Sequence, residues 1–135
     1  MEPAVEHEVT EILRRLNALG HYPLSLVCTE EGLLIASAGE RLRSEMVAIL
    51  TSLFSDIAVR AIRDLGLRQV DEFTLLDPAF GHLVVRPLDP VARPRLFLVV
   101  QVPRDRTWRR NTASFARKLL VLLRPLLAHP EGRPS

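Results

Sequence analysis

Four histidines are the side chains of this 135-residue sequence best suited to bind a metal ion or to transfer protons. His7, His21, His82 and His129 are scattered along the chain, and none has a second histidine four residues away. No acidic cluster lies near them at the spacing of metal ligands. The sequence therefore predicts no metal site.

The single cysteine and the paired carboxylates give no stronger indication of catalysis. Cys28 lies in an apolar run, which predicts a buried, inert thiol and excludes a disulfide within the chain. Glu30-Glu31 occupy an expected turn and Asp71-Glu72 the start of an expected strand, so solvation explains both pairs. The sequence also has no glycine-rich phosphate loop and no GxSxG motif. We therefore expect a protein that is not an enzyme, with no catalytic residues and no cofactor.

The segment from Arg104 to Lys118, RDRTWRRNTASFARK, is a basic cluster that could bind a polyanion. Its arginines could contact phosphates while Trp108 stacks on a base. Alternatively, Trp108 and Phe115 face a sheet and the arginines are the solvated side of a helix start. No second basic segment is present to complete a groove, so we favour this alternative and expect no nucleic acid partner. An acidic protein surface is a further candidate partner for these arginines.

The composition indicates one globular domain. Hydrophobic residues make up 47% of the chain and charged residues 25%, and the net charge of +2 is too small to indicate a polyanion partner by itself. We expect a single domain over residues 1–128 and a flexible C-terminal tail over 129–135. The acidic N-terminus lacks the apolar core of a signal peptide, and the apolar stretch near the C-terminus is shorter than the ~20 residues of a membrane span. These features predict a cytoplasmic protein without a membrane span.

The first half of the chain predicts a helix, a hairpin and a long second helix. Apolar residues recur every three or four positions over 5–19, and Gly20 is expected to end this helix. PLSLVCT and LLIASA have strand length, and the Glu30-Glu31-Gly32 turn between them predicts a tight antiparallel hairpin in which Gly32 supplies the positive φ. Residues 42–65 contain no Gly or Pro, and Gly66 follows them as a C-cap.

The second half predicts three strands and a closing helix. QVDEFTLLD and HLVVRP read as strands around a PAFG turn, and the continuous apolar run RLFLVVQV predicts a central strand covered on both faces. A helix is expected from about Thr107, with Pro125 bending or ending it. The predicted order is α-β-β-α-β-β-β-α, which is an α+β fold. The apolar stripe of the last helix comprises Trp108, Phe115, Leu119, Leu122, Leu123 and Leu126.

The long helix over 42–65 has two distinct faces when its residues are placed at 100° intervals. The broader face is apolar, and we expect it to pack on the sheet of its own chain. It carries Leu42, Met46, Ile49, Leu50, Leu53 and Ile57, extended by Val47, Phe54, Ala58 and Ala61.

The second face is built mostly of small residues, which would allow two helix backbones to approach closely. Their hydroxyl groups could also form hydrogen bonds across such a contact. An exposed Ser/Ala surface is the alternative, although a solvated face would more often carry long charged side chains. We predict that this face contacts a twofold-related copy and forms a dimer. The predicted interface residues are Ser44, Ala48, Thr51, Ser52, Ser55, Val59 and Ile62.

The order of elements and the hairpin LVCTEEGLLIASAG resemble the roadblock/dynein light chain superfamily over about residues 5–127. The clearest motif runs from Glu30 to Gly39, where an acidic tip and a glycine precede LLIASAG. The resemblance implies a five-stranded antiparallel sheet with helices on both faces, a roadblock/profilin-like sandwich. The proline-rich LDPVARP loop and the arginine-rich PRDRTWRR segment depart from the family pattern.

The resemblance also implies a partner and a function. Such proteins form homodimers, or heterodimers with a paralogous roadblock chain, through antiparallel second helices and third strands joined edge to edge. They bind small Ras-like GTPases as GTPase-activating or scaffolding partners. Carried onto this chain, the dimer helix is 42–65 and the joining strand is about Gln69 to Leu76, which adds Val70 and Phe73 to the predicted interface.

Two other functions remain open at the level of sequence. A small-molecule sensor domain of the GAF/PAS type would need a pocket between sheet and helix, to which Cys28, His82 and Arg86 could contribute polar groups. A nucleic-acid-binding protein would use residues 104–118 and would lose affinity steeply with salt.

Overall fold

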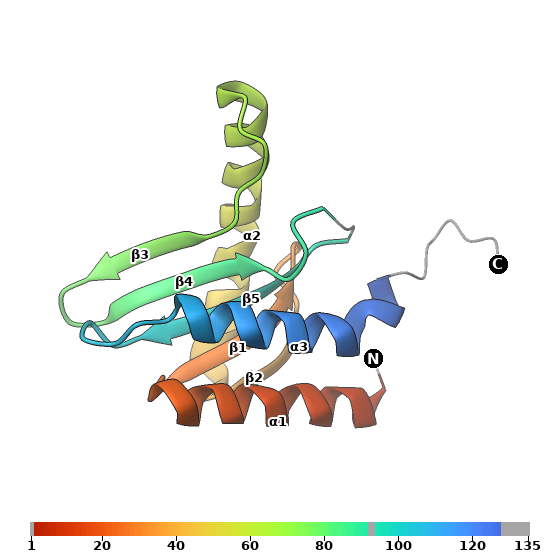
Figure 1. Ribbon diagram of the computed structural model, residues 1–135, viewed down its shortest axis with the longest axis vertical. Helices are drawn as coiled ribbons and strands as arrows, with labels where there is room; N and C mark the ends of the chain where they lie inside the picture. The colour runs from red at the N-terminus through yellow and green to blue at the C-terminus, as the bar shows by residue number, and fades with distance from the viewer. Residues whose placement is uncertain (1, 92–93, 128–135) are drawn as a thin grey trace.

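The computed structural model describes residues 2–91 and 94–127, and side chains as far as Arg124 and Pro125 in the last helix. The predicted tail over 129–135, the domain boundary at 128 and the side chain of Leu126 lie outside the described residues. The elements follow the predicted order (Figure 1). They are α1 (Pro3–Gly20), β1 (Leu24–Thr29), β2 (Leu34–Ala38), α2 (Arg41–Leu65), β3 (Phe73–Asp77), β4 (Gly81–Pro87), β5 (Leu96–Val102) and α3 (Arg109–Leu127).

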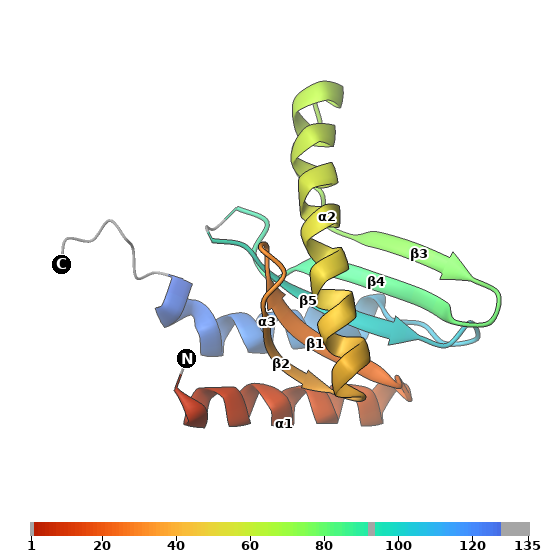
Figure 2. The same cartoon turned by 180° about the vertical axis from the view of Figure 1, so that it is seen from behind.

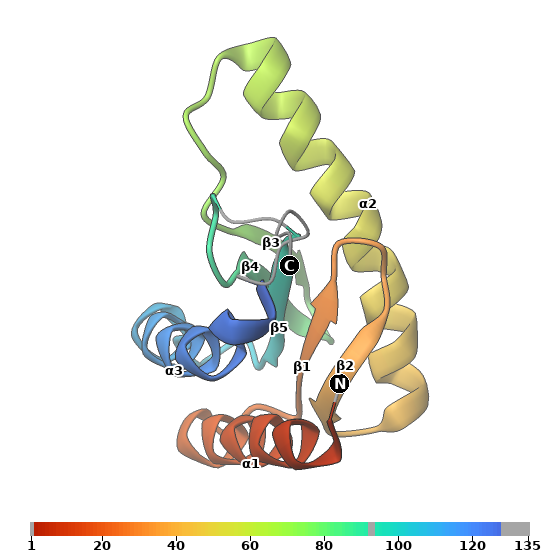
Figure 3. The same cartoon turned by 90° about the vertical axis from the view of Figure 1, so that its right-hand side faces the viewer.

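The five strands form one antiparallel sheet in the order β2-β1-β5-β4-β3. Helices α1 and α3 cover one face of the sheet and α2 crosses the other (Figure 3). The α+β sandwich predicted from the sequence is therefore confirmed. Strand β5 lies at the centre, as its unbroken apolar run predicts, because such a strand needs cover on both faces.

The core is divided by the sheet into two layers. Between the sheet and the α1/α3 layer, Leu13, Leu16 and Leu119 pack against Leu98 and Val100. The layer under α2 is smaller and contains Leu24, Leu26, Cys28, Val85 and Phe97, with Val47 and Ala48 from the helix.

The β1–β2 hairpin has the predicted geometry. Gly32 has a φ of +92°, and its N–H donates to the carbonyl oxygen of Thr29 at 3.0 Å. The N–H of Thr29 donates to the carbonyl oxygen of Leu33 at 2.9 Å, closing the turn. The acidic pair Glu30-Glu31 therefore lies at the hairpin tip, and the glycine supplies the left-handed conformation that other residues avoid.

Helix α1 ends at Gly20, as predicted. Gly20 is the last helical residue, and His21 adopts the left-handed conformation beyond it, with φ 59° and ψ 41°. A Cβ atom on Gly20 would lie only 2.0 Å from the ring of Tyr22. Gly20 is therefore needed for the packing of Tyr22 and not for a positive φ.

The remaining boundaries agree with the sequence except at three places. Helix α2 ends as predicted, with Gly66 at φ 71°. Strand β3 begins at Phe73 and not at 69, since the segment after Gly66 remains irregular. Helix α3 begins at Arg109, and Pro125 does not end it, because the helix continues to Leu127.

Candidate interaction surface

Helix α2, which crosses one face of the sheet (Figure 2), carries a row of large apolar side chains that are exposed in the single chain. The prediction that the broad apolar face packs on the sheet of its own chain is wrong for its six main residues, while Val47 and Phe54, which extend that face, do pack on the core layer under α2. Large apolar groups gathered on one exposed face are typical of a protein interface. The side chains are Leu42, Met46, Ile49, Leu50, Leu53 and Ile57, each between 43% and 63% exposed.

The small-residue face of α2 is the one that contacts the sheet. Ser44, Ala48, Thr51 and Ser55 are at most 6% exposed within the single chain. These four predicted interface residues therefore cannot contact a second subunit while the helix keeps this position. The prediction assigned the two faces of the helix the wrong way round.

Close approach between α2 and the hairpin explains why small residues are needed there. A Cβ atom on Gly32 would lie 3.3 Å from the carbonyl oxygen of Ala48. The buried hydroxyl groups are satisfied within the helix: Ser44 donates to the carbonyl of Glu40 at 2.8 Å, and Thr51 to that of Val47 at 2.9 Å. They therefore need no partner across a dimer contact.

The other predicted interface residues stay partly accessible. Ser52 and Ile62 are half-buried and Val59 is exposed on α2, while Val70 and Phe73 are half-buried beyond the helix. These five residues are therefore not enclosed by their own chain.

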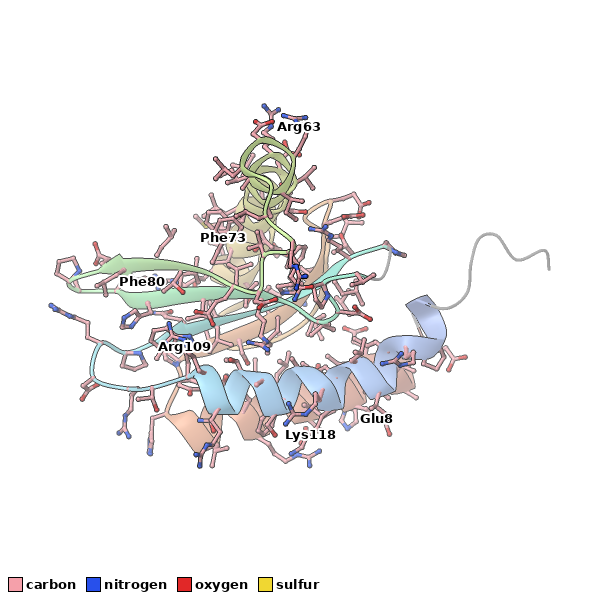
Figure 4. All side chains as sticks on the ribbon, turned by 45° about the horizontal axis from the view of Figure 1, so that its top comes forward. Glu8, Arg63, Phe73, Phe80, Arg109 and Lys118 are labelled. Carbon is pink, nitrogen blue, oxygen red and sulfur yellow. The ribbon has the colours of Figure 1, made fainter. Side chains whose placement is uncertain are left out.

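A groove of about 400 Å³ runs between the N-terminal half of α2 and the sheet. Leu42, Met46 and Leu50 line it from the helix, and Phe80 and Leu83 line it from β4 and the preceding turn. Figure 4 shows Phe80 at this turn. The groove extends the apolar row of α2 onto the sheet, and Glu40 and Arg43 also line it.

Strand β3 forms an open edge of the sheet. Among the described residues it pairs with β4 on one side and with no strand on the other, and its residues from Thr74 to Asp77 are exposed. Leu75 and Leu76 are more than half exposed, and the rings of Phe73 and Phe54 stack at 5.7 Å, joining the edge to α2. An exposed edge strand with apolar side chains favours pairing with another strand.

The basic segment packs as a structural element around its tryptophan. Trp108 is 9% exposed, its ring centroid lies 4.5 Å from that of His82, and its indole N–H donates to Glu72 at 3.2 Å. Phe115 is also buried in the α1/α3 layer. The interpretation that both aromatic residues face the sheet is confirmed, and stacking of Trp108 on a base is excluded by its burial.

The residues suggested for a small-molecule sensor do not line one pocket. Cys28 lies in the layer under α2, where burial raises the pKa of its thiol to about 12. His82 and Arg86 alternate with Leu83 and Val85 on β4 and therefore face the α1/α3 side of the sheet. The sheet separates the thiol from the other two groups.

The described ranges 2–91 and 94–127 contain no group of three or more His, Cys, Asp or Glu side chains placed to hold a metal ion. Within the same ranges, no helix has the length and apolar character needed to cross a lipid bilayer.

Solved structures show the same fold over nearly the whole chain. A structure described as MglB with tetrameric arrangement superposes with a TM-score of 0.79 and 14% identity, covering 94% of this chain and 96% of its own. The gliding protein MglB from Thermus thermophilus gives a TM-score of 0.77 and 14% identity, covering 93% and 95%. A roadblock/LC7 domain from Streptomyces avermitilis gives 0.67 and 17%, covering 87% and 96%.

No family model matches the sequence, and no curated protein matches it significantly. The similarity to the solved structures is therefore a similarity of fold and not of sequence. The chain has the roadblock/LC7 fold, as the resemblance in the sequence implied.

Proposed function

We propose that this protein is a dimeric, non-enzymatic regulator or scaffold that binds a small Ras-like GTPase. The roadblock/LC7 fold supports the proposal, because the sequence resemblance associates that fold with such partners. The observation that carries it is the apolar surface formed by α2 and the open β3 edge, which a monomer would leave in water.

The second copy of the chain, or a paralogous roadblock chain, is the proposed cover of this surface. In the dimer, the two α2 helices pack antiparallel through the row from Leu42 to Ile57, and the two β3 strands pair edge to edge. The same patch on both subunits then makes a self-complementary contact. Of the residues predicted from the sequence, Ser52, Val59, Ile62, Val70 and Phe73 are accessible enough to contact a second copy.

A dimer built through α2 and β3 leaves the α1/α3 layer of each subunit free to bind the GTPase. This layer has a groove of about 420 Å³ between the two helices, lined by Ile12, Lys118, Val121 and Leu122 among others. If the protein accelerates GTP hydrolysis, we expect it to do so by ordering the catalytic residues of the GTPase. The sequence singles out none of its own arginines as an arginine finger.

The test is a pull-down of purified Ras-like GTPases, each loaded with GDP or a non-hydrolysable GTP analogue, on the immobilised protein. We expect binding of at least one GTPase with a preference for the GTP-bound state. Val121→Glu, which places a charge on the α1/α3 layer at a residue 73% exposed, should weaken this binding without changing the oligomeric state. Absence of binding in both nucleotide states would refute the GTPase function.

A further inference from the structure

Four arginines surround the start of α3 on the side of the molecule away from α2. They are Arg104, Arg106, Arg109 and Arg110, here called the α3 arginine cluster, and all are exposed. Figure 4 shows Arg109 at the first turn of the helix. A hollow of about 510 Å³ lies beside the cluster, lined by Arg106, Thr107, Trp108, Arg109, Arg110 and Asn111.

The backbone that carries the cluster is held in place from several sides. The Tyr22 hydroxyl donates to the carbonyl oxygen of Thr107 at 2.6 Å and accepts from the Asn111 amide at 3.0 Å. The N–H of Arg106 donates to the carbonyl oxygen of Pro103 at 3.0 Å. With Trp108 buried behind it, the hollow is formed before any ligand arrives, which lowers the entropic cost of binding.

The cluster has an excess of positive charge, although the exposed Asp105 lies between Arg104 and Arg106 in the sequence. Arg109 lies 3.7 Å from the carboxylate of Glu72, and its guanidinium lies 4.8 Å from the centroid of the Trp108 ring. Within the described ranges, no carboxylate lies within 4.0 Å of a guanidinium nitrogen of Arg104, Arg106 or Arg110. From Arg106 to the end of α3 the sequence contains no acidic residue.

The cluster does not serve the stability of the helix. Cations in the first turn of a helix are repelled by the positive end of its dipole, and they also repel each other. Arg109 and Arg110 occupy this turn, so they weaken the start of α3 unless an anion covers them. Helix stability therefore does not explain why these arginines stand at the start of α3.

The residues around the cluster favour one class of anionic partner over the others. A nucleic acid partner would use an exposed aromatic ring for stacking, and Trp108 is 9% exposed. A membrane partner would use exposed apolar groups beside the basic ones, whereas the hollow is lined by arginine, threonine and asparagine around the buried indole. A carboxylate-bearing peptide needs only the guanidinium groups, which bind carboxylates in a forked geometry.

We propose that the α3 arginine cluster binds an acidic segment of another protein, with carboxylates seated in the hollow between Arg106 and Arg110. Arg109 keeps its contacts with Glu72 and Trp108 and shapes the hollow. The positive charge available to the ligand comes from the guanidinium groups of Arg104, Arg106 and Arg110. This site lies outside the α2/β3 surface, so it does not depend on the proposed dimer.

The experiment measures binding of a fluorescein-labelled hexaglutamate peptide by fluorescence anisotropy at low and physiological ionic strength. The variant Arg106→Ala/Arg110→Ala is compared with the matched control Arg60→Ala/Arg68→Ala, which removes the same charge from exposed positions on α2 and just beyond it. We expect the cluster variant to weaken peptide binding by about tenfold and the control to change it by less than about twofold. Circular dichroism and oligomeric state should be unchanged in both variants.

Competition distinguishes the source of the anion. A single-stranded oligonucleotide of equal charge and vesicles containing phosphatidylserine are titrated against the bound peptide. We expect both to compete more weakly than unlabelled hexaglutamate. The proposal is overturned if the peptide does not bind, if both double variants weaken it equally, or if the oligonucleotide or the vesicles bind the cluster more tightly than the peptide.

Discussion

The thiol of Cys28 lies on the face of β1 that α2 covers, close to the hydroxyl of Thr51. Burial raises its pKa to about 12, and the hydrogen bond with Thr51 opposes this only in part. The thiolate is the reactive form of cysteine, so the buried thiol is inert at neutral pH. The sequence predicted this state correctly from the apolar run around the residue.

The raised pKa of Cys28 predicts how stability depends on pH. The folded protein keeps the thiol protonated up to a pH near 12, whereas the unfolded chain loses the proton near pH 9. The unfolded state therefore binds fewer protons in this window, and the free energy of unfolding falls as the pH rises. We expect a loss of about 1 to 2 kcal/mol between about pH 9 and pH 10.5 from this group.

Urea unfolding of the wild type and of Cys28→Ala over this pH range measures the effect. The variant loses some stability at every pH because it removes a buried group, but it should lack the additional alkaline loss. Iodoacetamide should modify the native thiol slowly at pH 8 and the urea-unfolded thiol rapidly. Equal pH slopes for both proteins would show that Cys28 does not have the raised pKa.

At the scale of elements, local patterns determined most of the secondary structure. The Glu30-Glu31-Gly32 turn and the left-handed Gly66 were predicted because their conformations depend on the residues themselves. The end of α1 at Gly20 was also predicted, but this glycine is required by the ring of Tyr22, a contact that spacing along the chain does not reveal.

The orientation of α2 could not be predicted for a related reason. Periodicity separates a helix into faces but does not say which partner each face contacts. The larger apolar face was expected on the sheet, yet the sheet surface at β1 already carries Leu24 and Leu26, and the hairpin passes close to Ala48. Only small side chains fit there, so the large ones point outward. The burial of the two faces of α2 was therefore predicted the wrong way round.

The two faces of α2 should respond differently to substitution. Ala48→Leu places a larger group in the close contact with the hairpin, and we expect it to destabilise the fold by about 1 to 3 kcal/mol. Leu50→Glu changes an exposed residue, so we expect the fold to be kept while the dimer dissociates at least about tenfold more readily.

Thermal unfolding and light scattering at matched concentrations separate these effects. The control is Val121→Glu, an equally severe change at an exposed residue on the opposite layer. It should leave both the unfolding temperature and the oligomeric state unchanged. A wild type that is monomeric at micromolar concentration would contradict the dimer. A Leu50→Glu variant that dimerises normally would contradict the assignment of the interface to the apolar row.

The whole molecule presents one sheet with two unequal edges. β2 carries two buried residues and lies beside α2, whereas β3 is exposed along most of its length. The end of α2 extends beyond the sheet, above β3 and β4 (Figure 1). The apolar row and the open edge are therefore neighbours, and a twofold copy could cover both at once while continuing the sheet from β3 to β3.

Cross-linking through β3 tests this arrangement. In an antiparallel pair of identical strands, the residue nearest the twofold axis faces its own copy, with Cα atoms about 4.5 to 5.5 Å apart, a distance that a disulfide can span. Leu75 is the middle residue of β3. We therefore expect a single cysteine at Thr74, Leu75 or Leu76, placed in the Cys28→Ala background, to give a covalent dimer under mild oxidation.

The position of the efficient cross-link would also give the register of the two strands. Neighbouring residues point to opposite faces of the sheet, so efficiency should alternate along β3 and decline away from the axis. Ser37→Cys on β2 is the matched control, because it lies on the other edge strand and should remain monomeric on non-reducing gels. If light scattering shows a dimer but the β3 cysteines cross-link no better than this control, the subunits do not join through β3. The exposed row of α2 would then be the whole of the interface.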